Sequence, residues 1–265
     1  MKNTGTLLVL LPFLLFSQTY DPLGKTGIFL NSFLNIHTFP SSINGYTDFI
    51  SLSGDAVSIL YKSGRRGIFV STAGRSIYTA ANLTEGFWDL GIMGSYSSDT
   101  WSGIFSLGYN ATFSRTDISV SVEDGKFDVL NFKFEKELSS QKMLGAWITA
   151  GDSVSLLLDL MVTPTENRIF FLGAGGNSRE ILVTAGGYFP ISSWLYMELS
   201  GDFVREKDST YVQRRWGLAF EFSDFLAEFQ LNPRLLGYAP YFLTGHEADP
   251  SPLISVSFMY RFHTF

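Results

Sequence analysis

The feature that most constrains this chain is an alternation of apolar residues with small or polar ones at a period of two. Between 101 and 113, Trp101 and Phe105 fall on one face of an extended strand. Ser106 and Gly108 fall on the opposite face. Successive side chains of a β-strand point to opposite sides, so the pattern predicts strands with one apolar and one polar face. An all-β fold follows.

The same alternation recurs along most of the chain, in segments separated by Gly, Asn, Asp and Ser. Pairs such as Ser98-Asp99 and Gly151-Asp152 supply residues that favour hairpin turns. The segments from residue 68 onward are 68–78, 87–97, 101–114, 127–137, 143–151, 153–163, 168–175, 180–189, 193–204, 210–222, 224–232 and 253–263. Two earlier segments, 28–37 and 49–61, would raise the count from 12 to 14.

Composition bears on what the apolar face contacts, because a soluble β-sandwich alternates in the same way. The chain has 25 Phe, 12 Tyr and 5 Trp, more aromatic surface than a soluble core usually holds. A barrel in lipid places such residues on its outside and gathers them near both interfaces. Aromatic residues near predicted strand ends are Trp88, Trp101, Tyr109, Phe113, Tyr188, Trp194, Tyr211, Trp216 and Tyr260. We therefore expect a transmembrane, antiparallel, up-and-down β-barrel of about 12 to 14 strands, with a β-sandwich as the alternative.

The N-terminal region contains one apolar run, Leu7 to Phe16, which follows Lys2 and is interrupted by Pro12. A membrane-spanning helix needs roughly 20 apolar residues, whereas this length suits the central part of a signal peptide. A buried strand or helix of a soluble domain is the alternative interpretation. We predict a signal peptide at 1–18 and a single barrel at 19–265, in the outer membrane of a bacterial cell.

Several charged side chains fall on the polar faces of the predicted strands. Inside a barrel, an ionisable group must be solvated or paired, because an unpaired charge in a dry interior costs several kcal/mol. Two roles remain open for these side chains: pairing across the interior, or selection of cations along an open path. The residues predicted to face the lumen are Lys133, Glu135, Asp159, Glu198, Asp202, Arg215, Glu221, Glu228 and Arg261.

The last predicted strand ends in alternating aromatic residues. Phe258, Tyr260 and Phe262 share one face, and Phe265 follows at the end of the chain. This ending resembles the C-terminal signal that the barrel-assembly machinery recognises in outer-membrane proteins. The resemblance implies that this machinery is a partner of the chain.

A second resemblance lies in the stretch from Phe49 to Gly64. Phe49, Asp55, Ala56 and Tyr61 match a motif of the PorV/PorQ family of outer-membrane barrels, which is related to the FadL channels. Phe33 to Ile36, Gly45, Arg115 to Asp117 and Tyr260 to Phe262 also resemble that family. The resemblance implies that 28–64 forms a plug inside the barrel, with Phe49, Asp55, Ala56 and Tyr61 in it. Two wall strands are the alternative for this segment.

Other kinds of chemistry lack support in the sequence. The net charge of -6 argues against nucleic acid as a partner, since phosphate binding needs clustered Lys and Arg. There is no cysteine, and His37, His246 and His263 have no metal-ligand spacing. The glycines of 172–178 lack the spacing and the following helix of a dinucleotide site. We therefore predict that the protein is not an enzyme and holds no cofactor.

Three functions are compatible with these features. The first is a channel or transporter for small or hydrophobic solutes in contact with outer-membrane lipid. The second, implied by the family resemblance, is a barrel without transport that docks secretion or surface partners. The third is a secreted soluble β-protein whose aromatic residues form a core or a binding face.

Overall fold

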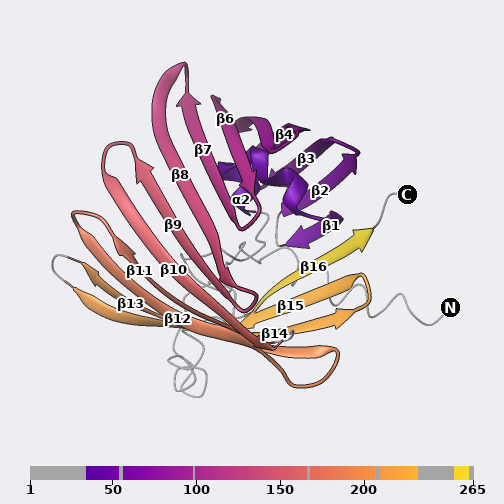
Figure 1. Cartoon of the computed structure of the whole chain (residues 1–265), viewed down its shortest axis with the longest axis vertical. Helices are drawn as coiled ribbons and strands as arrows, with labels where there is room; N and C mark the ends of the chain where they lie inside the picture. Colours follow the sequence, from indigo (N-terminus) through magenta and orange to yellow (C-terminus); the bar gives the residue numbers. More distant parts are fainter. Residues whose placement is uncertain are drawn as a thin grey trace, which may run out of the picture.

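The computed structural model describes residues 34–53, 56–97, 99–165, 168–206, 209–231 and 254–262. Within these residues, 16 antiparallel strands form one closed barrel, in which each strand pairs with its neighbours in the chain. Strand β1 pairs with β16 and closes the wall, so the barrel has no unpaired edge strand (Figure 1). The prediction of an antiparallel, up-and-down β-barrel is confirmed.

The strands follow one another with short connections, and only the segment between β15 and β16 is long. Their bounds are β1 (Asp48–Ser53), β2 (Ala56–Ser63), β3 (Arg66–Ala73), β4 (Ser76–Glu85), β5 (Trp88–Ser97), β6 (Thr100–Ala111), β7 (Ser114–Glu123), β8 (Lys126–Ser139), β9 (Lys142–Ala150), β10 (Val154–Thr165), β11 (Arg168–Gly176), β12 (Glu180–Pro190), β13 (Leu195–Glu206), β14 (Thr210–Phe222), β15 (Phe225–Leu231) and β16 (Ile254–Phe262).

The predicted strand count of 12 to 14 is wrong, because two predicted segments each contain parts of two strands and one strand is missed. The segment 68–78 contains a turn at Gly74-Arg75, where Gly74 has a φ of 57°. Only glycine adopts this left-handed conformation at no steric cost. The segment 49–61 likewise spans β1 and β2. Strand β7 lies at 114–123, where no strand is predicted.

The alternation places apolar side chains on the outside of the barrel. Phe105 is 64% exposed, whereas its neighbour Ser106 is 7% exposed. The β-sandwich alternative is therefore wrong, since it requires Phe105 to be buried between two sheets. Side chains on the outer face include Leu90, Ile92, Leu172, Ile181 and Phe203, all exposed.

Aromatic side chains gather near both ends of the barrel. At the end where β1 begins and β16 finishes, here called the terminal end, the rings of Trp88 and Tyr109 lie 4.7 Å apart. At the opposite end, the rings of Tyr96 and Trp101 are also 4.7 Å apart. One predicted end position is wrong, because Trp216 lies midway along β14. Tyr188 does lie near the end of β12, where it stacks on the buried Tyr196. The side chain of Tyr211 lies outside the described part.

A short helical stretch lies inside the barrel against one side of the wall (Figure 1). It consists of the helix α2 (Leu34–Thr38) and the 3-10 helix η1 (Pro40–Gly45), and we call 34–45 the inner segment. Its Ile36, Phe39 and Ile43 are fully buried. No described helix is long and apolar enough to cross a membrane.

The plug predicted at 28–64 is therefore corrected to a shorter segment, because 48–63 forms two wall strands. Phe49 in β1 and Ala56 in β2 are buried, and Tyr61 is exposed on the outer face. Of the segment 28–37, residues 34–37 are helical and not a strand. Three predicted features lie outside the described residues: Asp55, the signal peptide at 1–18, and the part of the plug at 28–33.

Candidate functional site

Three rows of inward side chains cross strands β4 to β8 under the inner segment. Strand register aligns them, because residues opposite each other in neighbouring strands point to the same side. The apolar row is Ala80, Met93 and Ile104. The uncharged polar row is Asn82, Gly91, Ser106, Ser119 and Asn131. The charged row, nearer the terminal end, is Thr84, Asp89, Gly108, Asp117 and Lys133.

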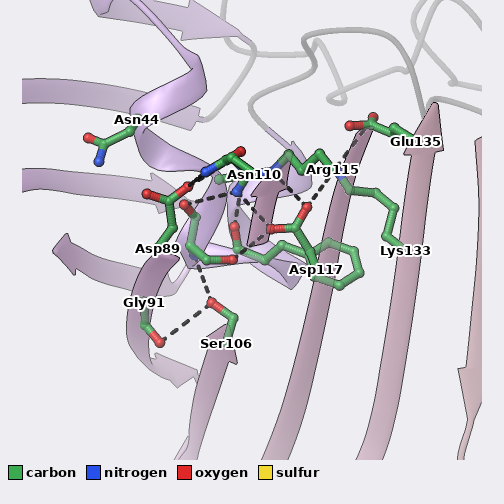
Figure 2. A network of polar contacts seen from close by, with 12 residues as sticks. Asn44, Asp89, Gly91, Ser106, Asn110, Arg115, Asp117, Lys133 and Glu135 are labelled. Atoms are coloured by element: carbon green, nitrogen blue, oxygen red, sulfur yellow. Dashed lines mark hydrogen bonds and ion pairs between the residues drawn. The ribbon is translucent and has the colours of Figure 1, made fainter. Parts of the chain in front are cut away.

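Arg115 is the centre of the polar network that Figure 2 shows. Its Nε and Nη2 donate to the two carboxylate oxygens of Asp117 at 2.8 and 2.7 Å. Its Nη1 donates to Asp89 Oδ2 at 2.9 Å and to Asn110 Oδ1 at 2.7 Å. Both carboxylates are buried, with side-chain exposures of 1% for Asp89 and 0% for Asp117. One guanidinium therefore compensates two buried negative charges.

Lys133 extends this network along the wall. Its Nζ lies 3.6 Å from both Asp117 Oδ2 and Glu135 Oε1. The same Nζ lies 5.3 Å from the centre of the Phe39 ring, which belongs to the inner segment. A cation over an aromatic face is attracted by the ring quadrupole. Lys133 thus contacts both the network and the inner segment.

Ser41 ties the inner segment to the network. Its backbone N–H donates to Ser106 Oγ at 2.7 Å, and its hydroxyl donates to Asp117 Oδ1 at 3.0 Å. Its carbonyl oxygen accepts from Arg115 Nη2 at 3.2 Å. Asn44 also donates to Thr84 Oγ1, which itself bonds to Asp89. The 3-10 helix is therefore bound by its backbone and by small polar side chains.

Glycine makes the close approach of this helix possible. A Cβ added at Gly91 would lie 2.2 Å from the backbone nitrogen of Ser41 and 2.3 Å from the carbonyl carbon of Pro40. A Cβ at Gly67 would lie 2.3 Å from Ile43 Cγ2. Neither position has room for a larger residue while η1 stays in place.

Aromatic contacts hold the other end of the inner segment. The His37 ring makes edge contacts with Phe69 at 5.3 Å and with Tyr78 at 4.6 Å between ring centres. Burial lowers the pKa of His37 to about 4, so its imidazole is neutral at pH 7. Burial also raises the pKa of Tyr46, just beyond η1, to about 12. The segment carries no described positive charge that would repel Arg115.

The other side of the interior, formed by β10 to β16, carries an acidic lining. Asp159, Glu198 and Asp202 are buried, and Thr184 donates to Asp202 Oδ1 at 2.6 Å. Near the terminal end, Glu221 pairs with Arg261 at 3.0 Å and Glu228 accepts from Ser257 at 3.0 Å. Among the described side chains of these strands, Arg261 is the inward-facing cation.

Most residues predicted to face the lumen are placed on the inner face, but in two separate groups. Lys133 and Glu135 join the network under the inner segment. Asp159, Glu198, Asp202, Glu221, Glu228 and Arg261 belong to the acidic lining. The side chain of Arg215 lies outside the described part.

The residues at the centre of the network were not predicted as lumen-facing. Arg115 and Asp117 lie on β7, which is not among the predicted strands, and Asp89 lies on β5 but is not among the residues predicted to face the lumen. The available signal was the alternation of Arg115, Asp117 and Ser119 with Thr116 and Ile118. That pattern has the same period as its neighbours.

The aromatic residues of the predicted assembly signal lie in the closing strand. Tyr260 is 51% exposed on the outer face of β16, and Phe258 stacks on Phe225 with ring centres 5.9 Å apart. Phe262 is the last residue of β16, and Phe265 lies outside the described residues. Recognition by the assembly machinery stays a prediction.

No group of three or more His, Cys, Asp or Glu in the described part has the arrangement of a metal site. No family model matches the chain and no curated protein matches it, so the resemblance to the PorV/PorQ family stays a prediction.

Solved structures that are similar to the barrel include mutants of the porin of Rh. blastica. One aligns over 82% of this chain and 99% of its own, with 7% sequence identity and a TM-score of 0.47. A second mutant has the same coverage, 8% identity and a TM-score of 0.48.

Proposed function

We propose that this protein is an outer-membrane channel through which small solutes pass, with the inner segment 34–45 as its plug. The observation that carries the proposal is the difference in polarity between the outer and inner faces of one closed wall. The outer face is apolar along the middle of the strands, whereas the inner face combines the apolar row under the inner segment with hydrogen-bonded and charged side chains.

The outer face favours lipid as its surroundings. Ile92 is 56% exposed and Phe105 64%, and their neighbours on the same face include the exposed Leu90 and Leu107. Apolar surface costs roughly 25 cal/mol for each Å² that water contacts, so a band around the whole barrel would be unstable in water. In a bilayer the same band replaces water with acyl chains.

The interior favours passage with a preference for cations. Barrels of about 16 to 18 strands are wide enough for an aqueous channel. Asp159, Glu198, Asp202, Glu221 and Glu228 line one side, and Arg261 is the described inward cation there. A lining of one sign concentrates counter-ions and excludes co-ions.

The test is conductance of the purified chain in planar bilayers, with and without residues 34–45. Removal of the inner segment should raise single-channel conductance, and the enlarged current should be carried mainly by potassium in a potassium chloride gradient. A compact, heat-sensitive gel band must show that the shortened chain still folds. Unchanged conductance would contradict a plug, and a preference for chloride would contradict selection by the acidic lining.

A further inference from the structure

The uncharged polar row contains two buried side chains that form no hydrogen bond with the inner segment. Asn82 is 6% exposed and Ser119 is 1% exposed. Within the described part, both amide atoms of Asn82 and the hydroxyl of Ser119 have no hydrogen-bond partner. Buried polar groups are nearly always paired, so these side chains need an explanation.

The same row already binds an uncharged hydrogen-bonding group. Ser106 Oγ accepts from the backbone N–H of Ser41, and its own hydroxyl lies 3.5 Å from the carbonyl oxygen of Gly91. Gly91 leaves room for the main chain of η1 to approach. The main chain of η1 therefore hydrogen-bonds to Ser106 in this row, but it leaves the polar atoms of Asn82 and Ser119 without a described partner.

The charged side chains on one side of the row are paired with one another. Asp89 and Asp117 are paired with Arg115, and Lys133 lies near Asp117 and Glu135. On the opposite side, the apolar row of Ala80, Met93 and Ile104 offers only contact. A ligand that needs a free charge therefore finds none here, whereas hydroxyl and amide groups find both donors and acceptors.

From this arrangement we infer that the uncharged polar row is a binding site for an uncharged solute rich in hydroxyl or amide groups, such as a sugar or polyol. The solute and η1 compete for the row. The solute bonds to Asn82 and Ser119, which η1 leaves unsatisfied, and so it displaces the plug. This inference rests on the proposed function.

The experiment measures osmotic swelling of vesicles that contain the folded full-length chain. Glucose is the uncharged probe and potassium gluconate, of similar size, is the charged comparison. The variants are Asn82→Leu and Ser119→Ala, which remove unbonded polar atoms. Ser95→Ala is the matched control, because the Ser95 hydroxyl pairs with that of Ser102 near the other end of the barrel, away from the row.

Each variant should keep or raise the temperature at which the compact gel band is lost, since neither removes a hydrogen bond of the plugged state. Entry of glucose relative to gluconate should fall, by about tenfold for Asn82→Leu and about threefold for Ser119→Ala, as expected for one or two lost hydrogen bonds. Ser95→Ala should leave that ratio unchanged.

Two failures are distinguishable. If neither the full chain nor the chain without 34–45 admits either solute, the proposed function is wrong. If both admit solutes but the glucose-to-gluconate ratio is the same in all variants, the binding site is wrong and the channel stands. A lower thermal stability of Ser119→Ala would also overturn the inference, since it would show that the hydroxyl is bonded in the plugged state.

Discussion

At the scale of single residues, Arg115 is the side chain on which the buried charges depend most. Replacing it with glutamine would leave the buried carboxylates of Asp89 and Asp117 with Lys133 as the nearest described cation. Breaking a buried ion pair from one side costs about 3 to 5 kcal/mol. We expect Arg115→Gln to lower the free energy of unfolding by this order, measured by urea titration of gel mobility.

The matched control is Arg65→Gln, because Arg65 pairs with Glu85 while 69% of its side chain is exposed. Exposed pairs contribute about 0 to 1 kcal/mol. Equal losses in the two variants would show that the contacts of Arg115 do not stabilise the barrel as described.

Gly91 provides a second test at this scale. The Cβ of Gly91→Ala would overlap the backbone of Pro40 and Ser41, so η1 must move away from the wall. We expect higher channel conductance and faster protease cleavage within 34–45. Gly94→Ala is the control on the same strand, since a Cβ there meets nothing within 4 Å. If the two variants behave alike, the close packing of η1 on β5 is not what holds the plug.

At the scale of elements, the docking of α2 should depend on pH through His37. The pKa of the docked imidazole is about 4, below its ordinary 6.5, because burial disfavours the charged form. As the pH falls from 6.5 towards 4, a displaced His37 binds a proton that the docked one does not, so docking weakens. Above pH 6.5 this contribution is fully present.

Channel conductance measured from pH 7 to pH 4 tests this directly. We expect it to rise through that window in the natural chain, and to rise much less in His37→Phe, which keeps the ring contacts with Phe69 and Tyr78 but cannot be protonated. The same rise in both chains would assign the effect to the carboxylates of the network instead.

Elements also show what the sequence could and could not predict. Period two identified the strand faces, because the outer side of each strand meets one environment and the inner side another. It failed at 68–78 and 49–61, because the inward positions shift by a single residue across each hairpin, as from Ser71 to Tyr78. A shift of one residue is easily mistaken for a local irregularity within one strand. The helical conformation of 34–38 had no signal, because it depends on contacts with β4 and η1 and a run of five residues is too short for a helical period.

At the scale of the whole molecule, closure of the barrel followed from the excess of aromatic residues and the lack of a long apolar helix. Which inward charges meet could not be predicted, because pairing depends on strand register. Arg115 reaches Asp89 across β6, and Arg261 reaches Glu221 across β15. When one strand is missed, the sequence assigns the wrong strand as the next-but-one neighbour of each strand beside it.

The most direct test of the account compares two tryptophans by fluorescence quenching in vesicles whose lipids carry bromine on their acyl chains. Trp216 lies midway along β14 on the outer face, and Trp147 lies inside beside Phe39. In chains that keep one of the two as the single tryptophan of the natural 5, brominated lipid should quench Trp216 strongly and Trp147 weakly. Equal quenching, or no quenching of Trp216, would contradict a barrel whose apolar face lies against lipid.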